Sequence, residues 1–270
     1  MSLLDKLSGK KEEKITGNHY EIIGFKPEEE SIMDLIGDVA SKAENPKKVK
    51  RDNVEYTILE KNYGPGIGVL VFVDDKGSIH CSVPAFKGKY KQTFEVSNVI
   101  PTGCGNEGII EGFVKTADGS KCTVCFSPAN FLEANVWKLK RGDKINARIA
   151  GLCYSLEAFK PKSEKKVMDK GPMKGEEVDF GFMGYIMPAN MQSKEHSDKY
   201  LLRGEILEVE TLKNSMTSDE LLRLHIDTKT IKLEILANKK YLVGDAKIGN
   251  YIFARVWLQG YVEGNSNEVK

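Results

Sequence analysis

Two cysteines three positions apart are the clearest candidates for chemistry in this sequence. Cys122 and Cys125 have the spacing of a zinc or redox pair, and Cys104 and Cys153 would complete a set of four thiols. A zinc pair needs a turn between its ligands, and a redox pair needs the start of a helix. The residues around Cys122 instead alternate as in a β-strand, which directs the two sulfur atoms to opposite faces. We therefore predict core thiols, with no metal site and no cofactor.

A histidine and a carboxylate form the second candidate. His225 and Asp227 alternate on an expected strand and would share a face, as a base pair or ligand pair requires, while His196 and Asp198 lie in a nearby loop. A half-exposed sheet face produces such pairs routinely. The sequence also lacks the G-x-x-x-x-G-K-[ST] phosphate loop, the G-x-S-x-G elbow and the H-E-x-x-H helix. We predict no catalytic residues, and an enzyme with a scattered site between domains stays open as an alternative.

A cluster of aromatic residues and methionines is the strongest candidate for binding. It contains Phe180, Phe182, Tyr185 and Met187, and Trp257 would lie on a strand opposite Ile252 and Ala254. One interpretation is packing of a strand between domains. The other is an adaptable apolar groove for a partner protein, because methionine and aromatic side chains fit irregular surfaces. We take these five residues as the predicted partner-binding site.

The elements that would position these residues begin with a helix. Pro27 and the glutamates after it open the helix, Ile32, Leu35, Ile36 and Val39 form its apolar stripe, and Asn45-Pro46 ends it. Strand-like runs follow, with a hairpin turn at residues 74–77. Residues 18–92 are thus predicted to form an α+β domain. Residues 1–17 are predicted to be a flexible segment, in which Leu3, Leu4 and Leu7 would face one side of a short helix. The alternative is that this apolar face docks a partner or a membrane surface.

The rest of the chain shows an internal duplication. Two stretches present the same order of landmarks, and the best match aligns Gly142-Asp143 and the following strand with Gly249-Asn250 and its strand. The glycines supply a turn with positive φ, after which alternate residues face a core. The other matched landmarks are residues 94–102 with 180–189, 109–114 with 201–206, and 122–126 with 222–226.

The duplication predicts two small β-barrels in tandem. They would span residues 93–158 and 179–265, joined by a polar, lysine-rich linker over 159–178. A glycine-centred strand, a second strand, a short helix opened by Ser127-Pro128 and a Gly-Asp strand resemble an OB-fold barrel in their order. The resemblance implies a fold class, mostly β after an N-terminal α+β part. It implies no function.

Charge and composition limit the partners. Lys and Arg total 40 against 39 Asp and Glu, which gives no overall field toward nucleic acid or an acidic membrane. The apolar runs are too short to span a bilayer, no secretory signal is evident, and five cysteines indicate reduced thiols, so we expect a cytoplasmic protein. We predict a non-enzymatic binding or assembly protein whose partner is another protein, as a homo- or hetero-oligomer.

The alternative ligand is single-stranded nucleic acid. It would bind the barrels through aromatic and basic side chains, namely Phe113, Lys144, Arg148, Tyr251, Phe253 and Arg255.

Overall fold

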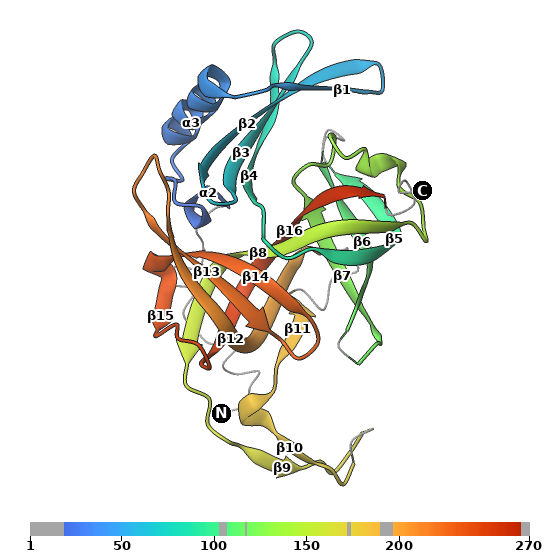
Figure 1. The fold of residues 1–270 in the computed structure, drawn as a ribbon, viewed down its shortest axis with the longest axis vertical. Helices are drawn as coiled ribbons and strands as arrows, with labels where there is room; N and C mark the ends of the chain where they lie inside the picture. Colours follow the sequence, from blue (N-terminus) through green and yellow to red (C-terminus); the bar gives the residue numbers. More distant parts are fainter. Residues whose placement is uncertain (1–18, 103–106, 117, 172–173, 190–196, 266–270) are drawn as a thin grey trace.

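The computed structural model describes residues 19–102, 107–116, 118–171, 174–189 and 197–265. Strands contain 57% of the chain and helical segments 12%. The prediction of a mostly β protein with an N-terminal helix is confirmed (Figure 1). Among the described helices, none is both long and apolar enough to cross a membrane. The expected docking segment around Leu3, Leu4 and Leu7 lies outside the described residues.

The N-terminal part is a helix packed on a four-stranded antiparallel sheet in the order β1-β2-β3-β4 (Figure 1). Its elements are α2 (His19–Ile22), α3 (Glu29–Lys42), β1 (Lys47–Arg51), β2 (Val54–Gly64), β3 (Ile67–Asp74) and β4 (Ile79–Phe86). Leu35, Ile36 and Val39 of α3 are buried, as the apolar stripe predicts. Gln259 ties β4 to the rest of the molecule, because its amide accepts from Phe86 N (2.9 Å) and donates to Pro84 O (2.8 Å).

The remaining strands form one ten-stranded sheet and a separate hairpin. The sheet contains β5 (Gln92–Thr102), β6 (Glu107–Lys115), β7 (Lys121–Pro128), β8 (Lys144–Phe159), β11 (Tyr185–Pro188), β12 (Lys199–Lys213), β13 (Glu220–Asp227), β14 (Lys232–Asn238), β15 (Leu242–Gly244) and β16 (Tyr251–Asn265). The hairpin is β9 (Lys165–Val167) with β10 (Glu177–Asp179). Short 3-10 turns are η1 (Val136–Lys138), η2 (Phe180–Phe182) and η3 (Lys239–Tyr241).

The strand pairings close two five-membered rings that share β8 and β16. The first ring runs β5-β6-β7-β16-β8 and returns to β5, and the second runs β12-β13-β14-β8-β16 and returns to β12. In each ring one pairing is parallel, β7 with β16 and β14 with β8. Strands β5 to β8 therefore supply four strands of the first ring, and β12, β13, β14 and β16 supply four strands of the second. The fifth strand of each ring is the long strand of the other set, β16 or β8.

The two rings are related by a local pseudo-twofold arrangement. In the first ring, Gly142 N donates to Val96 O (2.8 Å) and Val96 N donates to Asp143 O (2.8 Å). In the second ring, Gly249 N donates to Ile206 O (2.9 Å) and Ile206 N donates to Asn250 O (2.8 Å). Both glycines have positive φ, and a β-bulge follows Val96 in β5 and Ile206 in β12. The Gly142 and Gly249 turns are therefore equivalent positions.

The same relation holds along the shared strands. Gly151 follows Gly142 by the same number of residues as Leu258 follows Gly249, so the two are equivalent positions. They are also direct partners in the β8–β16 ladder. The pseudo-twofold axis therefore passes between these two residues.

Three details differ from the sequence-based picture. Ring order makes β12, β13 and β14 the counterparts of β5, β6 and β7. Residues 201–206 therefore correspond to β5 and not to 109–114, residues 222–226 correspond to β6 and not to 122–126, and residues 180–189 lie outside the ring, because short apolar strands resemble one another. The lysine-rich stretch after residue 159 contains the β9–β10 hairpin, which extends away from the rings at the lower end of Figure 1. Ser127 and Pro128 end strand β7 and open no α-helix, since the next helical turn is η1.

Candidate partner-binding face

Cross-strand register places much of the predicted site on one side of a sheet. Across β11, β12 and β16, Met187 lies opposite Leu201, which lies opposite Arg255. Two residues further along the strands, Tyr185, Arg203 and Phe253 form a second row of the same kind. All six side chains are half-buried. The row between them points inward, and its Leu202 and Ala254 are buried. We call the outward set the outer face: Tyr185, Met187, Leu201, Arg203, Phe253 and Arg255.

A tightly held turn, η2, borders the outer face. The guanidinium of Arg203 donates from Nη1 to Phe180 O (2.9 Å) and from Nη2 to Gly181 O (2.8 Å). Tyr251 Oη donates to Phe182 O at 3.1 Å, and the Tyr251 ring meets the Phe182 ring edge-on at 6.0 Å. Three consecutive carbonyl groups are thus fixed by side chains of β12 and β16. We call Phe180–Met183 the corner.

Asp179 anchors the other end of the corner. Its carboxylate accepts from Ser163 Oγ (2.6 Å), Glu164 N (2.8 Å) and Gly181 N (2.9 Å). These hydrogen bonds, the one from Ser163 first, lower the pKa of Asp179 below its ordinary value. The carboxylate therefore remains an acceptor and joins β10 to the chain that leaves β8.

Two glycines allow the backbone to approach so closely. A Cβ on Gly181 would lie 1.8 Å from Lys162 O, and one on Gly184 would lie 2.4 Å from Thr228 O. Any other residue at either position would push the corner away from its neighbours. On this fixed backbone Phe182 is 45% exposed and Met183 44% exposed.

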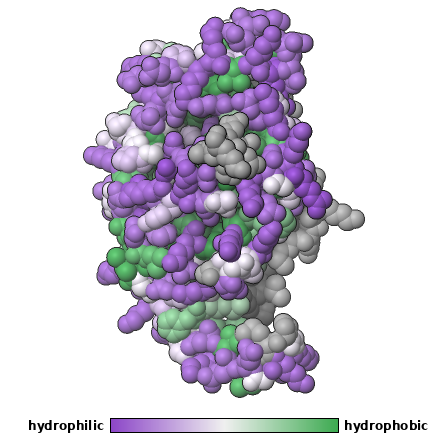
Figure 2. All heavy atoms as spheres, turned by 45° about the vertical axis from the view of Figure 1, so that its right-hand side comes forward, coloured by the Kyte–Doolittle hydropathy of each residue, from purple (hydrophilic) through white to green (hydrophobic). Residues whose placement is uncertain are grey.

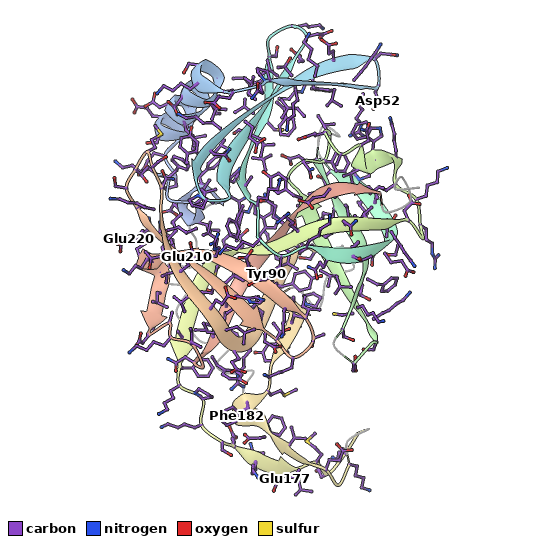
Figure 3. All side chains as sticks on the ribbon, viewed as in Figure 1. Asp52, Tyr90, Glu177, Phe182, Glu210 and Glu220 are labelled. Atoms are coloured by element: carbon purple, nitrogen blue, oxygen red, sulfur yellow. The ribbon has the colours of Figure 1, made fainter. Side chains whose placement is uncertain are left out.

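The figures show where these exposed side chains lie. Figure 3 places Phe182 just above the β9–β10 hairpin, close to the base of the second ring. Figure 2 shows a largely hydrophilic surface with hydrophobic residues near the hairpin end. The corner therefore presents two adjacent exposed apolar side chains, Phe182 and Met183.

Electrostatics distinguish the two arginines of the outer face. The Arg203 guanidinium lies over the rings of Phe159 (5.4 Å) and Tyr251 (5.9 Å). Both of its terminal nitrogens donate hydrogen bonds to carbonyl groups of the corner. Arg255, by contrast, has no carboxylate within ion-pair distance among the residues that the structure describes. Arg255 is consequently the cation of this face that is available to a partner.

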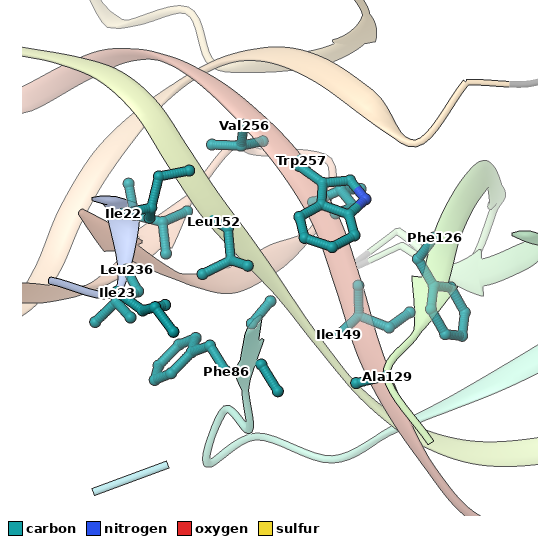
Figure 4. Packing of buried hydrophobic residues seen from close by; sticks show 14 of the residues in the cluster. Ile22, Ile23, Phe86, Phe126, Ala129, Ile149, Leu152, Leu236, Val256 and Trp257 are labelled. Carbon is teal, nitrogen blue, oxygen red and sulfur yellow. The ribbon is translucent and has the colours of Figure 1, made fainter. Parts of the chain in front are cut away.

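Trp257 shares the outward side of β16 but does not contribute to the exposed surface. It is 8% exposed, its indole stacks on His19 at 4.0 Å, and its Nε1 donates to Asp198 Oδ2 at 2.5 Å. Figure 4 shows it within the buried hydrophobic cluster. Strand alternation places Trp257 on the same side of β16 as Arg255. Nothing in the sequence indicates that His19 covers it.

The described cysteines are buried or half-buried thiols without disulfide partners. Burial raises the pKa of Cys125 to about 11 and that of Cys153 to about 12, so both thiols stay protonated. Cys122 is half-buried on the same strand as Cys125, and Cys104 lies outside the described residues. Within the described ranges, no three His, Cys, Asp or Glu side chains are grouped as metal ligands.

His225 belongs to a different arrangement from the predicted pair with Asp227. Its ring stacks on Tyr90 at 4.1 Å, and its Nδ1 lies 3.7 Å from Glu208 Oε1, to which Tyr90 Oη donates at 2.8 Å. Sequence analysis missed Tyr90, since it lies in the connection between β4 and β5. His196 lies outside the described residues.

Beside His225, Arg223 is buried on the same strand. It pairs with Glu210, and its Nε lies 3.7 Å from Glu234 Oε1. Glu234 in turn accepts from Lys89 N. This polar group fastens the connection between the N-terminal part and the rings.

The residues of the nucleic-acid alternative lie in two groups, one on β6 and the first half of β8 and one on β16. Tyr251 is buried, and Arg148 is engaged with Glu263 (2.5 Å) and Lys89 O (2.6 Å). Phe113 lies under the ammonium of Lys121 on the first ring. Lys144 lies at the start of β8, while Phe253 and Arg255 are on the outer face.

Comparison with known proteins locates a similarity on this part of the chain. Residues 177–260 are similar to a family described as "Domain of unknown function, E. rectale Gene description (DUF3881)". The matched stretch begins at β10 and ends within β16, so it contains the corner and the whole outer face but not β5 to β8. No curated protein matches the chain.

Proposed function

We propose that this protein is a non-enzymatic binding protein that holds a segment of a partner protein on the outer face and the corner. The observation that carries the proposal is the corner itself, where exposed Phe182 and Met183 stand on a backbone fixed by Arg203, Tyr251 and Asp179. Contiguous exposed apolar side chains rimmed by polar residues are typical of interaction sites. Aromatic and arginine side chains are the residues that most often dominate binding energy.

Rigidity favours binding at this place. Association loses free energy when side chains and loops must be ordered, roughly 0.5–1.5 kcal/mol for each mobile side chain. The corner has already lost its backbone freedom on folding, because Gly181 and Gly184 are wedged against neighbouring carbonyls. A partner would therefore meet a preorganised surface.

Charge suggests the character of the partner segment. Arg255 is half-buried among Met187, Leu201 and Phe253 and has no carboxylate to pair with in the described part of the chain. We propose an apolar partner segment with one acidic residue that pairs with Arg255. Either another protein or a second copy of this chain would satisfy this requirement.

The architecture proposed for the binding unit is a pair of small OB-like barrels. Support comes from the ring order, in which three consecutive strands are followed by a parallel neighbour and an antiparallel closing strand. Because β8 and β16 are shared, the outer face is built on strands that belong to both rings. The proposal includes a cytoplasmic location, which suits free thiols at Cys122, Cys125 and Cys153.

Site-specific photo-crosslinking in the native cell tests the proposal. A crosslinking amino acid replaces Leu201 on the outer face or, as a control, the exposed Thr123 on β7. We expect one protein adduct from position 201 that is absent from position 123 and is lost when Arg255→Glu is added. An adduct common to both positions, an adduct that survives Arg255→Glu, a nucleic-acid adduct or no adduct at 201 would each overturn the proposal.

A further inference from the structure

A second site lies between the N-terminal sheet and the first ring, apart from the outer face. It is a cleft of about 360 Å³ whose walls come from β1, β2, the chain after β4, the chain after β7, and β16. We call it the Tyr261 cleft. Its charged and aromatic lining residues are Lys47, Glu60, Lys87, Glu133, Tyr261 and Glu263.

The Tyr261 hydroxyl is the first observation that points to a ligand. Tyr261 is 7% exposed, yet in the part of the chain that the structure describes no hydrogen-bond partner meets its hydroxyl. The hydroxyl oxygen is not one of the fully buried, unpartnered side-chain atoms of the described residues, so it is open to the cleft, where a ligand can reach it. Burial raises the pKa of Tyr261 above its ordinary value, with the carboxylates of Glu60 and Glu133 contributing, so the hydroxyl is a permanent donor.

The wall beside Tyr261 is rigid. Asn130 is 7% exposed, and its amide donates to Val262 O (2.8 Å) and accepts from Val262 N (2.9 Å). Tyr261 itself pairs with Arg148 in the β8–β16 ladder. The hydroxyl is therefore held in place by its neighbours in the sheet and the loop.

Charge pairing in the cleft leaves one cation and one carboxylate weakly matched. Glu263 pairs with Arg148 (2.5 Å) and Lys91 (3.3 Å), and Lys47 pairs with Glu133 at 2.8 Å.

The remaining pair of opposite charges is Lys87 and Glu60. The ammonium of Lys87 lies 5.2 Å above the Tyr261 ring, and no ion pair joins it to a described carboxylate. Among the described residues, the ion pair of Glu60 is the longer contact with Lys47, at 3.8 Å. The cleft thus offers a positive and a negative group together with a neutral donor.

We propose that the Tyr261 cleft binds a small zwitterion with the chemistry of a free amino acid. The ligand carboxylate accepts from the Tyr261 hydroxyl and pairs with Lys87, and the ligand ammonium pairs with Glu60. A simple anion would face three glutamates, and a simple cation two lysines, so only a molecule carrying both charges is favoured at both ends. The cleft accommodates such a molecule with some water.

Calorimetric titration of the full chain with each of the twenty free amino acids tests this assignment. Every amino acid that binds is compared with its N-acetyl derivative and its carboxamide, each of which lacks one charge. Tyr261→Phe and Lys87→Met are the test variants, and Lys232→Met, an exposed lysine of β14 outside the cleft, is the control.

We expect saturable binding of at least one amino acid, weakened roughly tenfold to a hundredfold by either test variant and unchanged in the control. Neither singly charged analogue should bind comparably. The assignment is overturned if no amino acid binds, if Tyr261→Phe and Lys87→Met leave the affinity unchanged, or if an uncharged sugar binds equally well. None of these results bears on the outer face.

Discussion

A core substitution in the first ring should destabilise the second ring as well. Phe126 in β7 is fully buried and meets Phe94 edge-on at 5.1 Å. Its removal loosens the first ring, which contains β8 and β16. Because those strands also complete the second ring, we expect the two rings to unfold together. Phe126→Ala should therefore lower the stability of the molecule as one unit.

The size of the effect follows from the buried ring. Truncating a fully buried phenylalanine to alanine costs about 3–5 kcal/mol, since apolar contacts are lost and a cavity remains. Each 1.4 kcal/mol corresponds to about a tenfold change in an equilibrium constant. Hydrogen exchange that requires global unfolding should consequently accelerate by roughly 100-fold to 4,000-fold.

Hydrogen exchange read by mass spectrometry checks this at a distance from the substitution. The informative peptide covers β13, which belongs only to the second ring. Phe126→Ala should accelerate its slowest amides by the same factor as those of β6. The matched control is Thr123→Ala, an exposed position on the same strand, which should change stability by less than about 0.5 kcal/mol. Unchanged protection in β13, with loss of protection in β6, would refute the shared-strand argument.

Three further outcomes are expected. Gly181→Ala should cost about 1–3 kcal/mol, because the new Cβ would meet Lys162 O, and should expose the corner to limited proteolysis. Hydrogen bonds from two lysines and a tyrosine hold the pKa of Asp38 well below its usual range. The ionised carboxylate therefore stabilises the fold above about pH 4, and this stabilisation is lost as the pH falls. The difference in urea midpoint between the wild type and Asp38→Asn should consequently be smaller at pH 3 than at pH 7. Iodoacetamide at pH 8 should leave Cys125 and Cys153 unmodified in the folded chain and modify both in urea, as mass mapping would show.

Local features of the fold could be predicted because short-range rules govern them. The apolar stripe that includes Leu35 and Val39 marks α3, and the turns at Gly142 and Gly249 were recognised as equivalent from their neighbours alone. Strand alternation likewise placed Phe253 and Arg255 on the side opposite Ile252.

Long-range pairing could not be predicted in the same way. The contact of Gln259 in β16 with Ser127 in β7 joins strands far apart in the sequence, and neither strand carries a mark of its distant neighbour. The sharing of β8 and β16 between the two rings likewise leaves no mark in the local sequence pattern. The covering of Trp257 by His19 is a tertiary contact of the same kind.

The most direct test of the central claim is the affinity of the crosslinked partner, once purified, for variants of Arg255. A charge pair desolvated at an interface costs about 2–5 kcal/mol when one member is lost, which corresponds to roughly 30-fold to 4,000-fold in affinity. We predict a loss in that range for Arg255→Glu, and recovery when the opposing acidic residue of the partner is changed to arginine. Equal affinity of the wild type, Arg255→Glu and Phe182→Ala for the partner would contradict the account.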